Sequence, residues 1–261
     1  MFSSLLFSLT MMIDNFFYQY QYNIPLIVVN HSFLSLSIFP APVGDYMRGV
    51  TSLTNCVCVG TSTGSISVFR FNLSAGVSKG HLSTTTIEPL FNSSITALAS
   101  SETTLCGGNE LGDIFVYNTE FDKDFRFVVK FPGTGAPCTS ICCEKNTNNI
   151  FAGFATGHIR IYRPNICEIS IEITAHARSI TGMVLSPDHD YFATCGEDQF
   201  FQVWKIPDFT NPDFADLLKK DCLLFCEKLE NRLCTGIAFL SKNKIAIASY
   251  DDENLAIFQK K

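Results

Sequence analysis

The 261-residue sequence contains few charged residues and no basic run. Lysine, arginine, aspartate and glutamate together make up 17% of the chain, and the net charge is −6. Proteins that bind nucleic acids use lysine and arginine to neutralise phosphates, so this composition predicts no nucleic-acid partner. No glycine-rich loop leads into a predicted helix, which excludes the usual phosphate cradle. The chain also has no low-complexity tract, and its length suits one all-β domain.

Cysteine is abundant, with eleven residues, but the spacing predicts neither a disulfide framework nor a metal site. The count is odd, and most cysteines lie inside predicted strands, where a free thiol behaves as a small hydrophobic side chain. The nearest approaches to a zinc motif are Cys138 with Cys142 and Cys222 with Cys226, and the first pair has no histidine nearby. We therefore expect free thiols, no metal, no cofactor and a reducing, cytoplasmic location.

What the chain does contain is a repeated ten-residue frame that ends in an aromatic residue. Apolar residues stand one and three positions before each aromatic, which predicts a β-strand with one buried face. The spacings between the aromatics are 48, 45, 42 and 54 residues. A repeat of this length that carries strand patterns is typical of a β-propeller. The five closing aromatics are Phe69, Tyr117, Tyr162, Trp204 and Phe258.

Each repeat also contains three further apolar stretches, so we expect four antiparallel strands per repeat. In the third repeat these stretches are Thr139–Ile141, Ile150–Ala152 and Ile169–Ile173. A four-stranded sheet of this size cannot cover its own apolar faces, and stacking against its neighbours buries them. The sequence therefore predicts an all-β propeller with about five recognisable four-stranded blades.

A glycine occupies the turn inside the first three frames, at Gly64, Gly112 and Gly157. A tight hairpin turn requires a positive φ, which glycine adopts readily. The fourth and fifth frames have Gln199 and Glu253 at this position. We therefore expect the last two turns to have a different conformation.

The fourth repeat resembles a WD repeat. It contains His176 before the first strand, Ser-Pro-Asp ending at Asp188, and Asp198 six residues before Trp204. The resemblance implies a propeller blade in which one side chain from each of four places joins a hydrogen-bonded tetrad. That tetrad would contain His176, Thr194, Asp198 and Trp204. Lys205 follows the tryptophan where the family has aspartate.

The other four repeats lack both the aspartate and the tryptophan, so the resemblance implies only one tetrad. In physical terms, the single indole N–H of a buried tryptophan needs an acceptor, and histidine and aspartate can link two loops to a strand.

A narrower resemblance within the WD-repeat family covers residues 41–261. It is carried by Phe131–Cys138, Ile173–Ile180, Gly196–Asp198 and Val203–Lys205. It implies that these residues form the C-terminal five blades of a seven-bladed ring, so that the ring is partial. The last repeat ends at Phe258, and we expect its outer strand to be missing unless a segment upstream of Val50 supplies it.

Residues 1–40 lie outside this resemblance. The apolar stretch Met1–Ile13 has no basic residue and is followed by Asp14, so it does not fit a signal peptide or a membrane span. Ile24–Val29 and Phe33–Phe39 are able to form a hairpin that covers a blade edge. Three readings stay open: a misassigned or truncated start, a genuine edge cover, and a membrane or secretory segment.

No group of residues has the pattern of a catalytic site. His176 lies close to Arg178, but its position in the repeat favours the tetrad. Glu197 and Asp198 are adjacent in a turn and point apart, and residues 251–253 form an acidic turn typical of a solvated loop. We therefore expect no catalytic residues.

The function that the resemblance implies is a non-enzymatic scaffold that binds other proteins, whose identity the sequence does not give. Two alternatives remain. One is a propeller enzyme, which would need titratable side chains that converge on the central channel. The other is a membrane-anchored or secreted propeller that uses residues 1–29.

Overall fold

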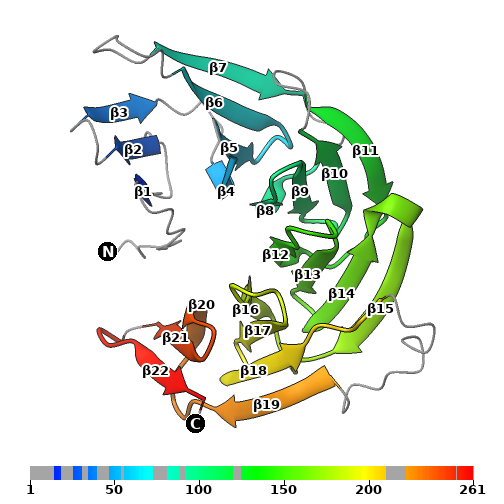
Figure 1. The fold of residues 1–261 in the computed structure, drawn as a ribbon, viewed down its shortest axis with the longest axis vertical. Helices are drawn as coiled ribbons and strands as arrows, with labels where there is room; N and C mark the ends of the chain where they lie inside the picture. Colours follow the sequence, from blue (N-terminus) through cyan, green and yellow to red (C-terminus); the bar gives the residue numbers. More distant parts are fainter. Residues whose placement is uncertain are drawn as a thin grey trace. The chain divides into compact units, whose positions relative to one another are not determined.

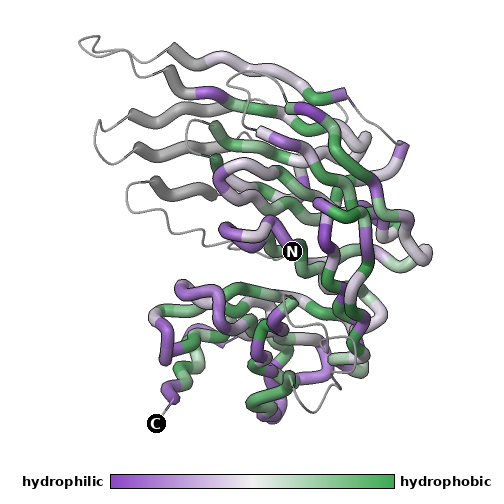
Figure 2. The backbone as a smooth tube through the Cα atoms, turned by 45° about the vertical axis from the view of Figure 1, so that its right-hand side comes forward, coloured by the Kyte–Doolittle hydropathy of each residue, from purple (hydrophilic) through white to green (hydrophobic). Residues whose placement is uncertain are grey.

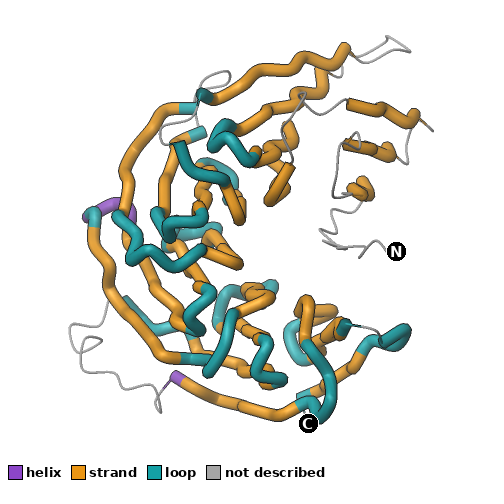
Figure 3. The backbone as a smooth tube through the Cα atoms, turned by 180° about the vertical axis from the view of Figure 1, so that it is seen from behind, coloured by secondary structure: helices purple, strands orange, loops and turns teal. Residues whose placement is uncertain are grey.

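The structure is a computed structural model that describes residues 15–18, 26–30, 35–39, 47–53, 56–72, 81–88, 92–119, 125–209, 222–250 and 252–260. The chain divides into two compact units, Met1–Ile95 and Thr96–Lys261. Strands and short connections make up nearly all of the described residues (Figure 3). None of the described helical turns is long enough or apolar enough to span a membrane.

The first unit begins with a three-stranded antiparallel sheet in the order β1-β2-β3. The expected N-terminal hairpin is present as β2 and β3, with Leu26 opposite Phe39. β1 pairs with the other edge of β2 and was not expected from the sequence. Residues 1–14, which carry the apolar stretch at the start, lie outside the described residues. The strands are β1 (Asn15–Tyr18), β2 (Leu26–Asn30) and β3 (Ser35–Phe39).

Blade 1 also lies in the first unit and is a four-stranded antiparallel sheet in the order β4-β5-β6-β7. Its second strand is completely buried, as the run of apolar and small residues predicts. The strands are β4 (Met47–Leu53), β5 (Cys56–Thr61), β6 (Ile66–Asn72) and β7 (His81–Ile87).

Blades 2 to 5 are four successive sheets, each built from consecutive strands (Figure 1). Blade 2 contains β8 (Ile95–Ser100), β9 (Thr104–Asn109), β10 (Ile114–Asn118) and β11 (Arg126–Phe131). Blade 3 contains β12 (Cys138–Cys143), β13 (Ile150–Phe154), β14 (His158–Arg163) and β15 (Glu168–Thr174), with the short 3₁₀ turn η1 (Pro164–Ile166) before β15. Blade 4 contains β16 (Ile180–Leu185), β17 (Tyr191–Gly196), β18 (Phe200–Lys205) and β19 (Leu223–Lys228). Blade 5 contains β20 (Cys234–Ser241), β21 (Lys244–Ser249) and β22 (Ala256–Gln259).

The blades of the second unit stack face to face, and the core fills the spaces between them. β12 contacts β9 and β16, and β20 contacts β16 and β17. One cluster lies between blades 2 and 3, a second between blades 3 and 4, and a third between blades 4 and 5. Hydrophobic residues run along the strands, and hydrophilic residues gather at the turns (Figure 2). Stacking in this way removes apolar surface from water at about 25 cal/mol per Å².

The closing aromatics occupy equivalent positions in the third strand of every blade. Trp204 pairs with Phe192 near the start of β17, and Tyr117 pairs with Leu105 at the matching place in β9. In blades 2, 3 and 4 the pairing with the fourth strand shifts by one residue at this aromatic, which is a β-bulge.

Adjacent residues of a strand face opposite sides, so the aromatic and the apolar residue before it lie on opposite faces, and both faces are buried instead of the one that the pattern predicted. In β14, Ile159 and Ile161 pack toward blade 4, whereas Tyr162 packs in the cluster between blades 2 and 3. Neighbours on both sides of the sheet therefore cover it.

The turn inside the fourth frame has the same conformation as the glycine turns, so the expectation that it differs was wrong. Gln199 has a φ of 70°, close to the 80° of Gly112 and the 81° of Gly157. The Gln199 N–H donates to the Gly196 carbonyl at 3.2 Å, which repeats the bond from the Gly157 N–H to the Phe154 carbonyl. A side chain is tolerated in this left-handed conformation at a cost of about 1–2 kcal/mol.

Blade 5 has three strands instead of four. β22 pairs with β21, and no strand of the described residues pairs with its other edge. Leu255 and Ile257 are 59% and 45% exposed beside this edge. The outer strand is therefore missing from the described part of blade 5, as expected.

Candidate functional site

The structure places the four tetrad residues of blade 4 in one hydrogen-bonded chain. Nδ1 of His176 lies 3.0 Å from Oδ1 of Asp198, and Nε2 lies 2.9 Å from Oγ1 of Thr194. Nε1–H of Trp204 donates to the same hydroxyl oxygen at 3.1 Å. His176, Thr194 and Trp204 are almost completely buried. These hydrogen bonds therefore tie the β15–β16 loop and the β17–β18 turn to strands β17 and β18.

One tautomer of His176 satisfies every hydrogen bond of the tetrad. The Thr194 oxygen accepts the indole N–H and keeps its own proton, which it can donate to Nε2 of His176 at 2.9 Å. Nδ1 then carries the proton and donates to the Asp198 carboxylate. A neutral imidazole satisfies every hydrogen bond of the tetrad.

Asp198 also accepts two backbone N–H groups. Its Oδ2 receives the Ala177 N–H at 2.9 Å, and its Oδ1 receives the Phe200 N–H at 3.2 Å. Burial raises the pKa of this carboxyl, but the hydrogen bonds from His176 and Ala177 outweigh burial, so the pKa lies below its usual value. The carboxylate is therefore held ionised, and it fixes two loops at once.

Glycine is needed at one position next to the tetrad because the loop approaches closely. A Cβ at Gly157, where φ is 81°, would lie only 2.1 Å from the carbonyl oxygen of His176. That approach lets the Gly157 carbonyl accept the N–H groups of Ala175 and His176 at 3.1 and 3.0 Å. The β15–β16 loop is thus seated on the turn of blade 3 as well as on blade 4.

Blade 2 fixes its corresponding turn with residues that the sequence reasoning missed. Asp113 accepts the Gly133 N–H at 2.8 Å and pairs with Lys130 at 2.9 Å. Asn109 donates to Asp113 at 3.0 Å, and its amide oxygen accepts the N–H groups of Leu111 and Asp113. Burial raises the pKa of Asp113, but Lys130 and these hydrogen bonds bring it below its usual value. The β9–β10 turn is therefore tied to the β11–β12 loop.

A repeated threonine at the start of the first strand is a second feature that was missed. Oγ1 of Thr96 donates to the carbonyl of Cys138 in the next blade at 2.6 Å. Oγ1 of Thr181 donates in the same way to the carbonyl of Cys234 at 2.7 Å. The sequence signal was an isoleucine or cysteine followed by threonine at the start of the first strand, which recurs in blades 2 to 5 at Thr96, Thr139, Thr181 and Thr235.

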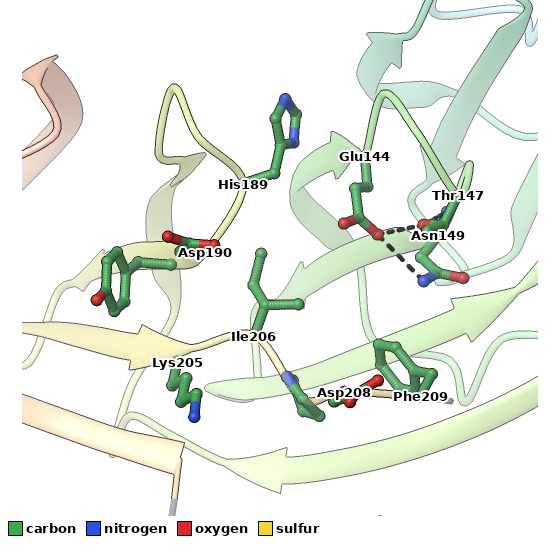
Figure 4. A pocket seen from close by; sticks show the side chains of 11 residues that line it. Glu144, Thr147, Asn149, His189, Asp190, Lys205, Ile206, Asp208 and Phe209 are labelled. Carbon is green, nitrogen blue, oxygen red and sulfur yellow. Dashed lines mark hydrogen bonds between the residues drawn. The ribbon is translucent and has the colours of Figure 1, made fainter. Parts of the chain in front are cut away.

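A cavity of about 470 Å³ opens at the junction of blades 3 and 4, at the end of the strands opposite the tetrad (Figure 4). Three segments line it: the β12–β13 turn with Glu144, the β16–β17 turn with His189 and Asp190, and the chain after β18 with Ile206 and Phe209. The sequence reasoning did not find it, because these segments come from two different repeats.

The cysteines and the other expected site residues lie as follows. All eleven cysteines are free thiols, and burial raises the pKa of Cys138 and of Cys195 to about 12. Among the described residues, no three histidine, cysteine, aspartate or glutamate side chains converge where they could hold a metal ion. Glu197 lies beside Asp198 in the β17–β18 turn and is exposed.

The stacked four-stranded sheets and the hydrogen-bonded chain of blade 4 define a WD-repeat β-propeller protein. The chain belongs to the WDR54 family, whose family model matches residues 5–260. The narrower resemblance expected for residues 41–261 is confirmed. The match also includes most of residues 1–40, so the boundary at residue 40 is not the edge of the family match.

Curated relatives support this assignment. The chain is 26% identical over 217 residues to WD repeat-containing protein 54 of Homo sapiens, which is 79% of this chain and 61% of that protein. It is 24% identical over 215 residues to WD repeat-containing protein 54 of Mus musculus, with the same coverage. The chain thus spans about three fifths of the length of these relatives.

Solved structures show the same fold at lower identity. A chain in the crystal structure of the mitotic checkpoint complex superposes with a TM-score of 0.73 at 13% identity, over 94% of this chain and 70% of that chain. Sqt1 from Chaetomium thermophilum superposes with a TM-score of 0.72 at 14% identity, over 91% of this chain and 62% of that chain. At these identities the likeness concerns the fold alone.

Proposed function

We propose that this chain is a non-enzymatic scaffold that binds other proteins through the loops at the ends of its blades. The observation that carries the proposal is that loops at the strand ends are held in place by side chains. Asp198 fixes the β15–β16 loop through the Ala177 N–H, and Asp113 fixes the β11–β12 loop through the Gly133 N–H. A loop that is ordered before binding loses less conformational entropy on association.

Two titratable groups at this end of the blades, His176 and Asp198, are engaged in structural bonds. The His176 ring donates to Asp198 and accepts from Thr194, and the Asp198 carboxylate accepts two backbone N–H groups. This engagement supports a scaffold over the alternative of a propeller enzyme. A cytoplasmic location, with no nucleic-acid or membrane partner and no cofactor, is part of the proposal, and the net charge of −6 supports the absence of a nucleic-acid partner.

We further propose that the described blades belong to a larger ring. Two observations support this proposal: among the described residues β22 pairs with β21 alone, and the chain covers 61% of the human relative. The count of seven blades stays a prediction.

The scaffold proposal can be tested by cross-linking in cells followed by mass spectrometry. The full chain, a D198A variant and an E197A variant would be compared, because Glu197 is the exposed neighbour of Asp198 in the same turn. We expect reproducible cross-links from loop residues of the chain to other proteins. D198A should weaken the cross-links that involve the β15–β16 loop, and E197A should keep them. A chain without reproducible protein partners would overturn the proposal, as would turnover of a substrate by the purified protein.

A further inference from the structure

The cavity between blades 3 and 4 contains a buried carboxylate, that of Glu144. Glu144 is only 7% exposed. Its Oε2 accepts a hydrogen bond from the Thr147 hydroxyl and another from Nδ2 of Asn149 at 3.1 Å. Within the described part of the chain, Oε1 receives no hydrogen bond and no cation lies within ion-pair distance of this carboxylate. Oε1 is not one of the fully buried atoms, so it faces the open cavity, where a carboxylate without a cationic partner favours a positive ligand.

The turns at this end of the neighbouring blades are bridged by lysine. Between blades 2 and 3, Lys145 pairs with Glu102 at 2.7 Å. Between blades 4 and 5, Lys242 pairs with Asp188 and, at 3.2 Å, with Asp190. The hydrogen bond from Lys242 lowers the pKa of Asp188 below its usual value. The junction of blades 3 and 4 has the cavity at the place where its neighbours have a lysine bridge.

The charges that line the cavity are mostly negative. Glu144, Asp190 and Asp208 contribute three carboxylates, and Lys205 contributes one ammonium group. Figure 4 shows Lys205 directed away from Glu144. Asp190 is itself paired with Lys242 at 3.2 Å, so a cation entering the cavity would be attracted mainly by the carboxylate of Glu144.

The remaining wall of the cavity is apolar and includes an aromatic ring that already binds a cation. Ile206, Pro207 and Phe209 form this wall. The guanidinium carbon of Arg163 lies 5.7 Å from the ring centroid of Phe209. Apolar and aromatic surface beside a carboxylate suits a side chain with an aliphatic stem and a charged head. The volume is within the usual range for a ligand pocket.

We propose that this cavity binds a cationic side chain, arginine or lysine, of a partner protein, with the charged head at Oε1 of Glu144 and the stem against Ile206 and Phe209. The inference rests on the proposed scaffold function and names the chemistry of one contact. At the junction of blades 3 and 4 the partner protein would supply the cation. At the two neighbouring junctions Lys145 and Lys242 of this chain supply it.

The test uses four pools of ten-residue peptides that are random except for the central residue. That residue is arginine, lysine, citrulline or glutamate, and citrulline keeps the shape of arginine without its charge. The labelled full chain is applied to each pool, and the affinity of selected peptides is measured by fluorescence polarisation. We expect binding to the arginine and lysine pools above the citrulline and glutamate pools. Whichever of the arginine and lysine pools binds more tightly identifies the preferred cation.

Three variants connect this binding to the cavity. E144Q removes the buried charge and should weaken binding at least about tenfold. D208K places a cation at an exposed lining position and should weaken binding to a similar extent without depending on the packing of Glu144. The matched control E197Q removes a carboxylate at the opposite end of blade 4 and should bind as the unmodified chain does.

Equal binding of all four pools would overturn the proposal, and so would unchanged binding by E144Q or D208K. If E144Q fails to fold in a thermal melt, D208K alone decides. Partner proteins that cross-link equally to the unmodified chain, E144Q and D208K would refute the cavity proposal and leave the scaffold function intact. An unmodified chain without any protein partner would refute the scaffold function itself.

Discussion

In blade 4 the β17–β18 turn is fixed by Asp198 against His176, whereas in blade 2 the β9–β10 turn is fixed by Asp113 against Lys130 and Gly133. Leu111 occupies the position in blade 2 that matches Asp198 in blade 4, and it is 51% exposed. The carboxylate of blade 2 lies two residues later in the frame. Asp198 holds the loop that enters its own blade at β16, whereas Asp113 holds the loop that leaves its blade toward β12.

In both blades a carboxylate of the β-turn between the second and third strands holds an end loop, although the residues and the loop differ. Each carboxylate accepts a backbone N–H from the neighbouring loop, at Ala177 in one case and Gly133 in the other. A propeller blade therefore keeps its end loops ordered with or without the tetrad. The proposed scaffold function depends on that order, which the Asp113 contacts provide in blade 2 without a tetrad.

The largest expected effect comes from breaking the tetrad at its centre. T194V removes the hydroxyl that serves both Trp204 and His176, and it leaves two buried polar atoms without partners. We expect a loss of roughly 2–4 kcal/mol, since each unsatisfied group costs about 1–3 kcal/mol. Urea unfolding measures this loss. A change of less than about 0.5 kcal/mol would show that the tetrad does not stabilise blade 4.

Removing either carboxylate should give the next largest effect. D198A removes the carboxylate that accepts from His176 and the Ala177 N–H, and D113A removes the one that accepts from Lys130 and the Gly133 N–H. We expect each to cost about 1–3 kcal/mol. Because they lie in different blades and share no partner, the double variant should show additive losses in thermal or urea unfolding. A strongly non-additive result would mean that the two turns are not independent.

Substitutions in the two turns should change the stability by smaller amounts and in opposite directions. G112A places a side chain at a φ of 80°, with its Cβ 2.3 Å from the Ala136 carbonyl oxygen, and should cost at least about 1–2 kcal/mol. Q199G removes the strain of a side chain in the left-handed conformation, but it raises the conformational entropy of the unfolded state. We therefore expect it to stabilise the protein by less than about 1 kcal/mol. Melting temperatures compare the two variants. Equal destabilisation would contradict the equivalence of the turns.

The smallest effect is a dependence on pH that both blades should share. The pKa values of Asp113 and Asp198 are lowered in the folded protein, so the contribution of these carboxylates to stability is fully present above their unfolded-state pKa of about 4. It is lost as the pH falls through the folded pKa. The stability difference between the unmodified chain and D113N or D198N should therefore be constant near neutral pH and shrink below about pH 4. Urea unfolding between neutral pH and pH 2.5 tests this, and a difference that persists unchanged in acid would contradict it.

The strand pattern could be predicted from the sequence because it depends on residues close together in the chain. The alternation before Trp204 and Tyr117 identifies the third strands, and the WD signature of the fourth repeat identifies the tetrad residues. Asp113 could not be found in this way, since its partner Gly133 is 20 residues away in a loop with no regular pattern. Glu144 was missed for a similar reason, because the other walls of its cavity belong to the next blade.

The turn at Gln199 was predicted wrongly because the argument used the preference of the residue alone. The hydrogen bond from the Phe200 N–H to Asp198 and the bond from the Gln199 N–H to Gly196 hold the turn in place. Hydrogen bonds within the turn therefore outweigh a conformational preference of about 1–2 kcal/mol.

Amide hydrogen exchange at Ala177 and Gly133 tests most directly the claim that each end loop is fixed by its own carboxylate. In the unmodified chain both amides should be protected, because each donates to a carboxylate. D198A should remove protection at Ala177 alone, and D113A should remove it at Gly133 alone. Exchange of both amides at the rate of an unfolded peptide in the unmodified chain would contradict the account.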